Sequence, residues 1–264
     1  MLYFVWVIYM QEKMYLIDLD GTMYCGDTIC EGAKEFIDYL LANHKPFLFL
    51  TNNARRTGRM NVEQMEKMGF SGIEEKHFFT SAMAAAAYIA KKDPKHKRCA
   101  YIGEAGLKEA LENKGFEIVD TDVDYVFIGL DIHATYMDYS RALTHLLRGA
   151  KLVGTNVDRK IPKDDGFNCG NGSIVAMFEY ASGQESEKLR KPYAPILDAC
   201  LEYCNKSKEE CAIIGDNLET DIKLGVDNGV ETIFITTGVH DESDIERLHI
   251  HPTKTIHNLM ELIK

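Results

Sequence analysis

The stretch "MYLIDLDGTMY", residues 14–24, decides how this chain folds. A short apolar run ends at Asp18, and a second carboxylate, Asp20, follows after a single leucine and directly before Gly21. An apolar run of this length, closed by a turn signal, is typical of a buried strand. The strand period of two places both carboxylates on one side of the chain, and Gly21 permits a tight turn with peptide N–H groups near an anion. The stretch therefore predicts two carboxylates that face one small site.

Short apolar segments alternate with amphipathic helical stretches throughout, which predicts an α/β fold with a parallel sheet covered by helices. The segments assigned to this sheet are residues 14–18, 46–51, 211–216 and 231–236. Three of them end in Asp18, Thr51 and Asp216. Because ligands bind at the carboxyl ends of strands in open α/β sheets, we expect a polar site at this edge.

A second series of elements lies between the strands of this sheet. Its predicted strands are residues 100–103, 116–119, 125–131 and 151–156, and its predicted helices include 104–114 and 136–148. These strands carry fewer convergent carboxylates, and we interpret them as a smaller α/β domain inserted into the first. With hinges near residues 80–81 and 182–183, the predicted organisation is a core of residues 1–80 and 183–264 and an inserted domain of residues 81–182.

Charge and cysteine content limit the partner and the compartment. The net charge of −11 argues against a surface that binds a nucleic acid polymer or an anionic membrane. Seven cysteines, an odd number without an export signal, favour the cytoplasm and free thiols. Cys200, Cys204 and Cys211 are expected to be small buried hydrophobes rather than zinc ligands, because no fourth ligand keeps metal-site spacing.

The opening residues, 1–9, are apolar but too few to span a bilayer. We favour upstream sequence ahead of a true start at Met10, with an added edge strand as the alternative.

The paired carboxylates indicate phosphoryl transfer. One can attack phosphorus and form an aspartyl-phosphate, while the other protonates the leaving oxygen and later deprotonates water. Two carboxylates repel a phosphate unless cations offset their charge, and Mg²⁺ is the natural choice because it prefers oxygen ligands. This chemistry predicts a third carboxylate and a lysine elsewhere in the chain.

The segment "IIGDNLETDI", residues 213–222, supplies Asp216 at a strand end and Asp221 just inside the next helix, where it can orient metal-binding groups. Lys191, in "LRKP", is the candidate lysine.

The segment "FLTNNARR" adds Thr51 and Asn52, whose hydroxyl and amide donors suit phosphoryl oxygens. We expect Arg55 and Arg56, at its end, to be solvated helix residues, with the alternative that one of them reaches the site. Each segment alone is weak, since DxDGT also occurs as a helix-capping turn and TNN as a loop. Their order along the chain is specific, because four separate segments fit one mechanism.

These segments resemble the motifs of the haloacid dehalogenase (HAD) superfamily, and the chain is similar in particular to its subfamily IIA, the NagD-like phosphatases. The resemblance runs from about Met14 to the end. It also includes "GLDIHATY" at 129–136, "GTNVDRKIP" at 154–162, "CGNGSIVAMFEYASG" at 169–183 and "GVETIFITTGV" at 229–239. The family implies a Rossmann-like core with an inserted α/β cap domain of the C2 type.

The resemblance also implies a role for each motif residue. Asp18 is the implied nucleophile and a Mg²⁺ ligand, and Asp20 is the general acid/base that binds Mg²⁺ through its backbone carbonyl. Lys191 balances charge, Asp216 binds the metal, and Asp221 supports the site. The implied phosphate- or substrate-binding residues are Thr51, Asn52, Asn53, Asn156 and Asn217.

One residue departs from the family pattern. Arg190 precedes the Lys-Pro pair where the family usually has glycine, so it either strains the turn or adds a positive group near the pocket. Cap residues are expected to choose the substrate, because a closing cap meets the leaving group. The candidates for contact with the leaving group are Asn156, Asp158, Arg159, Lys160 and Ile161. For Arg159 and Lys160, a surface loop without such a contact is an equally good interpretation.

The sequence therefore predicts a cytoplasmic, Mg²⁺-dependent phosphatase, monomeric or homodimeric, that acts on small phosphorylated metabolites such as nucleoside monophosphates, sugar phosphates or p-nitrophenyl phosphate. A phosphomutase or phosphotransferase is the first alternative. A phosphate- or nucleotide-binding protein without turnover is the second.

Overall fold

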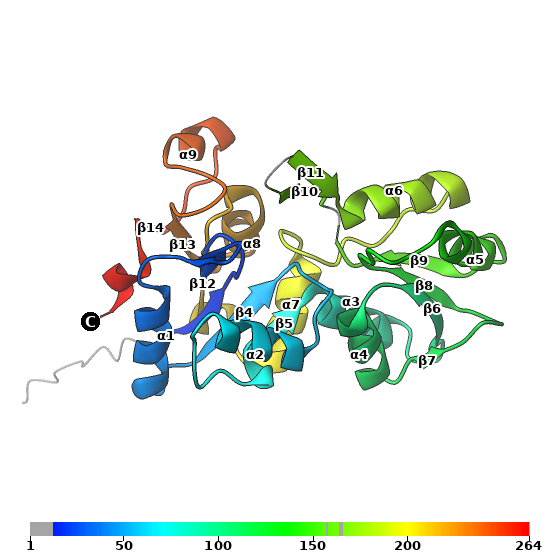
Figure 1. The fold of residues 1–264 in the computed structure, drawn as a ribbon, viewed down its shortest axis with the longest axis horizontal. Coiled ribbons are helices and arrows are strands. Elements are labelled where there is room, and N and C mark those ends of the chain that lie inside the picture. The colour runs from blue at the N-terminus through cyan, green and yellow to red at the C-terminus, as the bar shows by residue number, and fades with distance from the viewer. Residues whose placement is uncertain (1–12, 157, 164–165, 264) are drawn as a thin grey trace, which may run out of the picture.

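The computed structural model describes residues 13–156, 158–163 and 166–263. It contains two parallel sheets, each with helices on both faces, that lie side by side along the long axis of the molecule (Figure 1). The apolar opening of the chain, residues 1–9, lies outside the described residues.

The larger sheet has six parallel strands in the order β14-β13-β12-β1-β4-β5. Their bounds are β1 (Met14–Ile17), β4 (Phe47–Thr51), β5 (Phe78–Thr80), β12 (Cys211–Gly215), β13 (Glu231–Ile235) and β14 (Lys254–Ile256). From β1 the chain adds strands on one side, and later, from β12, on the other. The strand order therefore reverses at β1, and such a switch point opens a crevice at the carboxyl ends of the strands.

Helices bury both faces of this sheet. Helices α1 (Ala33–Ala42) and α2 (Gly58–Lys67) cover one face, while α3 (Ser81–Lys92), α7 (Ala194–Cys204) and α8 (Lys223–Asn228) cover the other. Ile17 packs in the first of these layers and Leu16 in the second, each with no exposed surface. Burial on both faces explains why β1 reads as a continuous apolar run rather than an alternating one.

The smaller sheet is also parallel, in the order β7-β6-β8-β9. Its strands are β6 (Arg98–Ile102), β7 (Glu117–Ile118), β8 (Tyr125–Ile128) and β9 (Lys151–Gly154). Helix α4 (Ala105–Asn113) covers one face together with α3, and α5 (Tyr136–Leu147) and α6 (Asn171–Ser182) cover the other.

Helix α3 packs against both sheets. Its sequence, "SAMAAAAYIAKK", is rich in alanine, and Ala84 lies in the core of the larger sheet while Ala82 and Ala85 lie in that of the smaller one. Small side chains on several faces let one helix approach two layers closely. The division of the chain into a core and an inserted domain at residues 81 and 183 stays a prediction.

Two antiparallel hairpins complete the architecture: β2 (Tyr24–Cys25) with β3 (Thr28–Ile29), and β10 (Lys160–Lys163) with β11 (Gly166–Cys169). Figure 1 shows β10 and β11 on the upper side of the molecule, beside α6. The surface-loop reading of Lys160 is wrong, because this residue and Ile161 belong to β10. The short elements not yet placed are η1 (Glu75–His77), η2 (Lys208–Glu210), η3 (Leu218–Ile222), α9 (Ser243–Leu248) and η4 (Leu259–Leu262).

The predicted α/β class with a parallel sheet is confirmed. Seven of the eight predicted strands match observed ones to within two residues at each end, and the one predicted over 125–131 stops at Ile128. The short strands β5 and β14 were not predicted. In the described part of the chain, none of the helices has the length and apolar character needed to cross a bilayer.

Candidate active site

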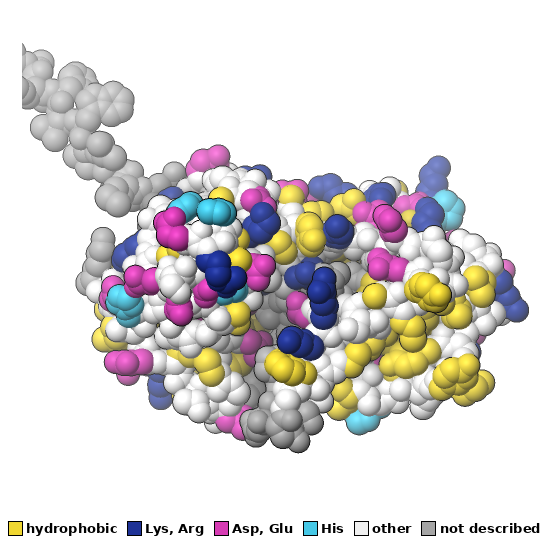
Figure 2. All heavy atoms as spheres, turned by 90° about the horizontal axis from the view of Figure 1, so that it is seen from above, with side chains coloured by type: hydrophobic (Ala, Val, Ile, Leu, Met, Phe, Trp, Pro, Cys, Tyr) yellow, Lys and Arg dark blue, Asp and Glu magenta, His cyan; other side chains and the backbone are white. Residues whose placement is uncertain are grey.

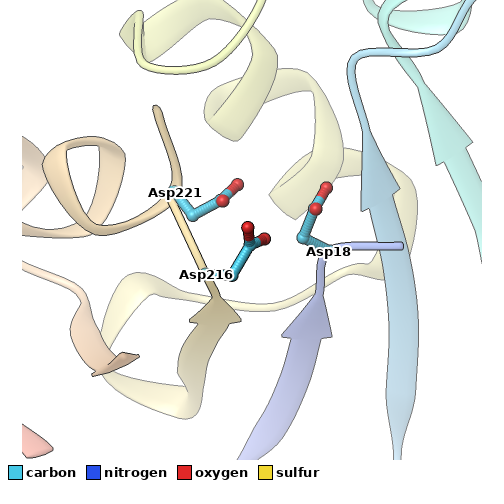
Figure 3. Close-up of side chains that lie close together, drawn as sticks. All are labelled: Asp18, Asp216 and Asp221. Carbon is cyan, nitrogen blue, oxygen red and sulfur yellow. The ribbon is translucent and has the colours of Figure 1, made fainter. Parts of the chain in front are cut away.

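Three carboxylates meet at the reversal point of the larger sheet. Asp18 follows β1, Asp216 follows β12, and Asp221 comes from η3 (Figure 3). One oxygen from each of the three lies within 4.8 Å of the others. The figure shows the three side chains pointing toward one another.

The turn after β1 is built as the sequence predicts. The N–H of Asp18 still donates to the carbonyl of Ile214, at 2.9 Å, so this residue continues the pairing with β12. Gly21 then adopts a φ of +93°, which favours glycine, and its N–H donates to the carbonyl of Tyr24 at 2.7 Å. The turn fixes the carboxylate of Asp18 at the mouth of the crevice.

Lys191 lies among the carboxylates with a side chain only 3% exposed. Its ammonium donates to Oδ1 of Asp18 at 2.5 Å, to Oδ1 of Asp221 at 2.6 Å and to the carbonyl of Leu50 at 2.7 Å. All three of its donors are therefore used. Burial alone lowers the pKa of Lys191, but Asp18 and Asp221 outweigh burial, and the net pKa is raised, so the side chain stays charged.

Asp216 lies in a cradle that requires two glycines. Its Oδ2 accepts the N–H of Val239 at 2.7 Å, and its Oδ1 accepts the hydroxyl of Thr22 at 3.2 Å. A Cβ on Gly21 would come within 2.3 Å of its Oδ2, and a Cβ on Gly238 within 2.0 Å. No larger residue fits at either position while the carboxylate keeps this place.

Asp221 is held by a short π-helical turn, η3. The side chain of Asn217 caps this turn by accepting the N–H of Glu219 at 3.0 Å, and the N–H of Asn217 donates to Oδ2 of Asp221 at 3.3 Å. A Cβ on Gly215 would lie 2.3 Å from the Cβ of Asp221. In this arrangement the side chain of Asn217 shapes the turn, and its predicted contact with substrate stays a prediction.

The three carboxylates carry more negative charge than Lys191 offsets. Burial raises the pKa of Asp18 well above its usual range, even though Lys191 opposes the shift. Burial and the nearby Asp221 raise the pKa of Asp216 to about 6. Buried carboxylates that share one lysine are a set of oxygen donors that fits a divalent cation such as Mg²⁺.

Asp20 lies at the exposed edge of this group. Surrounding protein desolvates its carboxyl and raises its pKa, while Arg56 and Lys191 lower it in part. Arg56 also lies near Tyr24, where burial raises the pKa of the phenol and Arg56 lowers it in part. Arg56 thus reaches the site, whereas Arg55 pairs with Glu104 at 2.8 Å. Both arginines precede α2, so their assignment to a solvated helix was wrong.

The segment after β4 borders the same crevice. The hydroxyl oxygen of Thr51 accepts the N–H of Asn53 at 3.1 Å, which leaves the hydroxyl hydrogen to donate. Oδ1 of Asn52 accepts the N–H of Lys191 at 3.0 Å, and Nδ2 of Asn52 donates to the carbonyl of Lys191 at 3.4 Å. The side chain of Asn52 therefore positions the lysine. Oδ1 of Asn53 accepts the N–H of Arg55 at 3.1 Å.

Asn156 connects the smaller sheet to this segment. Its Nδ2 donates to the carbonyl of Asn52 at 3.3 Å and to Oδ2 of Asp158 at 2.7 Å. Arg159 and Lys160 are exposed, and Ile161 is half-buried. Seen from above, the surface is hollowed between the two halves of the molecule, with Lys and Arg side chains around the hollow (Figure 2). Asn156 and Asp158 thus lie close to Asn52 and Arg190, on the loops that carry the site. This position agrees with their prediction as residues that contact a leaving group.

Arg190 does not strain its turn, because it is not among the residues with positive φ. Its side chain is 11% exposed, and its guanidinium lies 3.6 Å from Oδ1 of Asp158. The second expectation for this residue, a positive group near the pocket, agrees with this position.

Two contributions were not predicted from the sequence, the hydrogen bonds of Thr22 and Val239 to Asp216. The position of Arg56 beside Asp20 agrees with the alternative that one of the two arginines reaches the site. The stretch "GVETIFITTGV" contains Gly238 and Val239, but its pattern indicated only a strand. A pocket of about 970 Å³ lies elsewhere, between α3, α4 and α7, and Phe79, Tyr88 and Tyr203 line it without any of the carboxylates above. We place the site at the carboxylates because their chemistry, unlike the volume of that pocket, specifies a reaction.

Two families match the chain. The family described as haloacid dehalogenase-like hydrolase matches residues 15–117. The family described as HAD-hydrolase-like matches residues 188–262.

Relatives match along nearly the whole chain. The acid sugar phosphatase of Staphylococcus epidermidis, strain ATCC 12228, is 41% identical over 248 residues, which cover 94% of this chain and 95% of the relative. The acid sugar phosphatase of Staphylococcus aureus, strain MRSA252, is 39% identical over 254 residues, covering 96% and 97%.

Solved structures match over a similar share of the chain. A single-mutant thermostable NPPase from Geobacillus stearothermophilus has a TM-score of 0.85 and 34% identity, covering 96% of this chain and 98% of that one. NagD from E. coli K-12 has a TM-score of 0.87 and 29% identity, covering 96% and 98%.

Proposed function

The chain belongs to the haloacid dehalogenase-like hydrolase family, as its motifs predicted, and we propose that it is a Mg²⁺-dependent phosphatase of small phosphomonoesters. The observation that carries the proposal is the convergence of Asp18, Asp216 and Asp221 within 4.8 Å at the reversal point of the sheet. Relatives named acid sugar phosphatase and NPPase support this reaction class.

Asp18 and Asp216, with the backbone carbonyl of Asp20, are the residues that would hold Mg²⁺. When bound, the cation offsets negative charge on the carboxylates and on the phosphoryl group. Asp221 is already occupied by Lys191 and by the N–H of Asn217, so its role is to hold these groups in place.

Asp18 is the nucleophile in this proposal. One of its oxygens bonds to phosphorus while the bond from phosphorus to the ester oxygen breaks, which leaves an aspartyl-phosphate. Lys191 stabilises the ionised carboxylate before attack, because its ammonium lies 2.5 Å from Oδ1 of Asp18. Its donors are preorganised by Leu50 and Asp221, so they need no rearrangement during the reaction.

Asp20 is the general acid and base. Burial raises the pKa of Asp20 and so favours the protonated form, which can give a proton to the leaving oxygen. The resulting carboxylate then takes a proton from water as that water attacks phosphorus and releases Asp18. Its exposed position leaves room for both the leaving group and the water.

The remaining predicted residues bind or position. Thr51 has a free hydroxyl hydrogen for a phosphoryl oxygen, and Asn52 holds the backbone of Lys191. Asn53 orders the same loop, and Asn217 orders the turn that carries Asp221. Asn156, on the loop after β9, is proposed to contact the leaving group of the substrate.

Sugar phosphates are the substrate class we favour, because two relatives near 40% identity are named acid sugar phosphatases. A cap formed by residues 81–182, a cytoplasmic location and a monomeric or homodimeric state remain part of this proposal.

Phosphate release tests the function. We expect wild-type protein to release phosphate from p-nitrophenyl phosphate and from sugar phosphates with Mg²⁺, and not with EDTA. Asp18→Asn should lower kcat by a factor on the order of a thousand or more, while Asp27→Asn, in the exposed turn between β2 and β3, should change it little.

Full activity in Asp18→Asn would refute the nucleophile assignment. Transfer to a sugar hydroxyl, seen as isomerised product without free phosphate, would favour the phosphomutase alternative. Phosphate binding without any turnover would favour the binding protein.

A further inference from the structure

Arg190 stands beside the catalytic lysine and reaches across to the loop that follows β9. Its Nη1 donates to the carbonyl of Lys191 at 2.6 Å, and the same nitrogen lies 3.6 Å from Oδ1 of Asp158. The guanidinium carbon lies 5.8 Å from the ring centre of Tyr193, which packs against it. One side chain thus touches the turn that carries Lys191 and the loop that carries Asp158.

A second route joins the same two loops. Asp158 accepts Nδ2 of Asn156 at 2.7 Å, and this Nδ2 also donates to the carbonyl of Asn52 at 3.3 Å. The side chain of Asn52 hydrogen-bonds to both the N–H and the carbonyl of Lys191. The contacts therefore close into a ring: Arg190, Lys191, Asn52, Asn156, Asp158 and back to Arg190.

The ring is anchored on both sides. On the side of the smaller sheet, the buried Asn171 donates to the carbonyls of Asn156, at 3.1 Å, and of Ile128, at 3.0 Å. On the side of the larger sheet, the ammonium of Lys191 is fixed by Asp18 and Asp221. We therefore expect a displacement of either loop to shift the other.

Arg190 is the least satisfied member of the ring. Its buried Nε has no hydrogen-bond partner among the residues that the structure describes, and the 3.6 Å from its Nη1 to Oδ1 of Asp158 is longer than a hydrogen bond. The side chain of Asp158 is 43% exposed, so this contact is the one that opens most readily. The guanidinium of Arg190 therefore links the turn that carries Lys191 to the loop that carries Asp158 without fixing the position of one relative to the other.

We propose that Arg190 is a positioning residue that couples the loop bearing Asn156 and Asp158 to the placement of Lys191. The inference rests on the proposed phosphatase function and deepens it. Through its contacts with Lys191 and Asp158, Arg190 makes the chemical step sensitive to the position of the loop after β9. A residue that instead contacted the leaving group would act mainly on substrate binding and would depend on which leaving group is present.

The test is a double-mutant cycle on turnover. We expect Arg190→Ala to lower kcat about tenfold with little change in KM, for p-nitrophenyl phosphate and for a sugar phosphate alike. Asp158→Asn should lower kcat in the wild-type background and have no further effect in Arg190→Ala, because its influence passes through Arg190. Arg190→Lys should recover part of the loss, since one ammonium reaches only one of the two partners. Arg148→Ala, at an exposed position after α5, is the matched control and should leave kcat unchanged.

Additive effects of Arg190→Ala and Asp158→Asn in active enzyme would overturn the inference, as would a change confined to KM that varies with the leaving group. A wild type without turnover would contradict the proposed function instead. In that case the same cycle on the free energy of unfolding decides the inference, because the ring predicts coupling there and its absence would refute the contact. Arg190→Lys and Asp158→Asn keep the test available if Arg190→Ala fails to fold.

Discussion

Nζ of Lys191 lies 2.5 Å from Oδ1 of Asp18, in a position where solvent reaches almost none of the lysine side chain. The same ammonium also donates to Asp221, while Asp216 accepts hydrogen bonds from two neutral donors in the described part of the chain, the hydroxyl of Thr22 and the N–H of Val239. One buried ammonium thus pairs with two of the three clustered carboxylates. We expect the stability of the metal-free protein to depend on this ammonium.

Lys191→Met should destabilise the protein strongly when no Mg²⁺ is present. The substitution leaves the carboxylates buried and unpaired, and breaking such an arrangement costs about 3–5 kcal/mol. Urea unfolding at neutral pH in EDTA measures the loss. Lys223→Met is the control, because its pair with Asp227 is about half exposed and should contribute about 1 kcal/mol or less. Equal losses for the two variants would contradict the role given to Lys191.

Stability without metal should fall as the pH rises through the raised pKa of Asp216. The folded carboxyl, with its pKa raised to about 6 from 3.8, binds a proton more tightly than the unfolded one. The folded state is therefore favoured at low pH, and this contribution is lost between about pH 4 and pH 6, on the order of 3 kcal/mol for this one group.

Mg²⁺ should reverse that decline, because the cation competes with protons for the same oxygens. The measurement is the midpoint of thermal unfolding from pH 4 to pH 8, with EDTA and with Mg²⁺. We expect the stabilisation by Mg²⁺ to grow with pH. A stabilisation of constant size across this range would argue against binding at Asp18 and Asp216.

Arg56→Met should move the alkaline limb of the pH dependence of kcat to higher pH. Arg56 lowers the pKa of Asp20, and its removal lets that pKa rise further. The general acid then keeps its proton to higher pH, so the fall in rate comes later. Turnover of p-nitrophenyl phosphate between pH 5 and pH 9 tests this. Arg59→Met, which removes an exposed partner of Glu63, should leave the profile in place, and a shift shared by both variants would contradict the assignment.

The sequence predicts the position of those site residues that stand at the end of a strand. Asp18, Thr51 and Asp216 each stand at the end of an apolar run, and parallel pairing brings such ends to one edge of a sheet. Charge balance predicted that the site needs a lysine, and the segment "LRKP" supplied Lys191 as the candidate, whose ammonium donates to both Asp18 and Asp221.

Other contacts could not be predicted, because they depend on how loops approach in space. Arg56 lies beside Asp20 through the packing of two loops, and no spacing in "TNNARR" indicates that contact. The side chain of Asn52 holds Lys191, at a separation of 139 residues. The strands β5 and β14 were missed because each has three residues, too few for a period to show.

Gly238→Ala should disable the site through crowding alone. A Cβ at this position would lie 2.0 Å from Oδ2 of Asp216, so the carboxylate must move and lose the N–H of Val239. We expect kcat to fall about tenfold to a hundredfold and the Mg²⁺ concentration for half-maximal rate to rise.

Gly229→Ala separates crowding from backbone strain. Gly229 has a φ of +71° with open space around its Cβ position, so alanine there should cost about 1–2 kcal/mol of stability and leave kcat intact. Initial rates against Mg²⁺ concentration, with urea unfolding of both variants, make the comparison. If Gly238→Ala kept the wild-type response to Mg²⁺, the assignment of Asp216 as a Mg²⁺ ligand would be wrong.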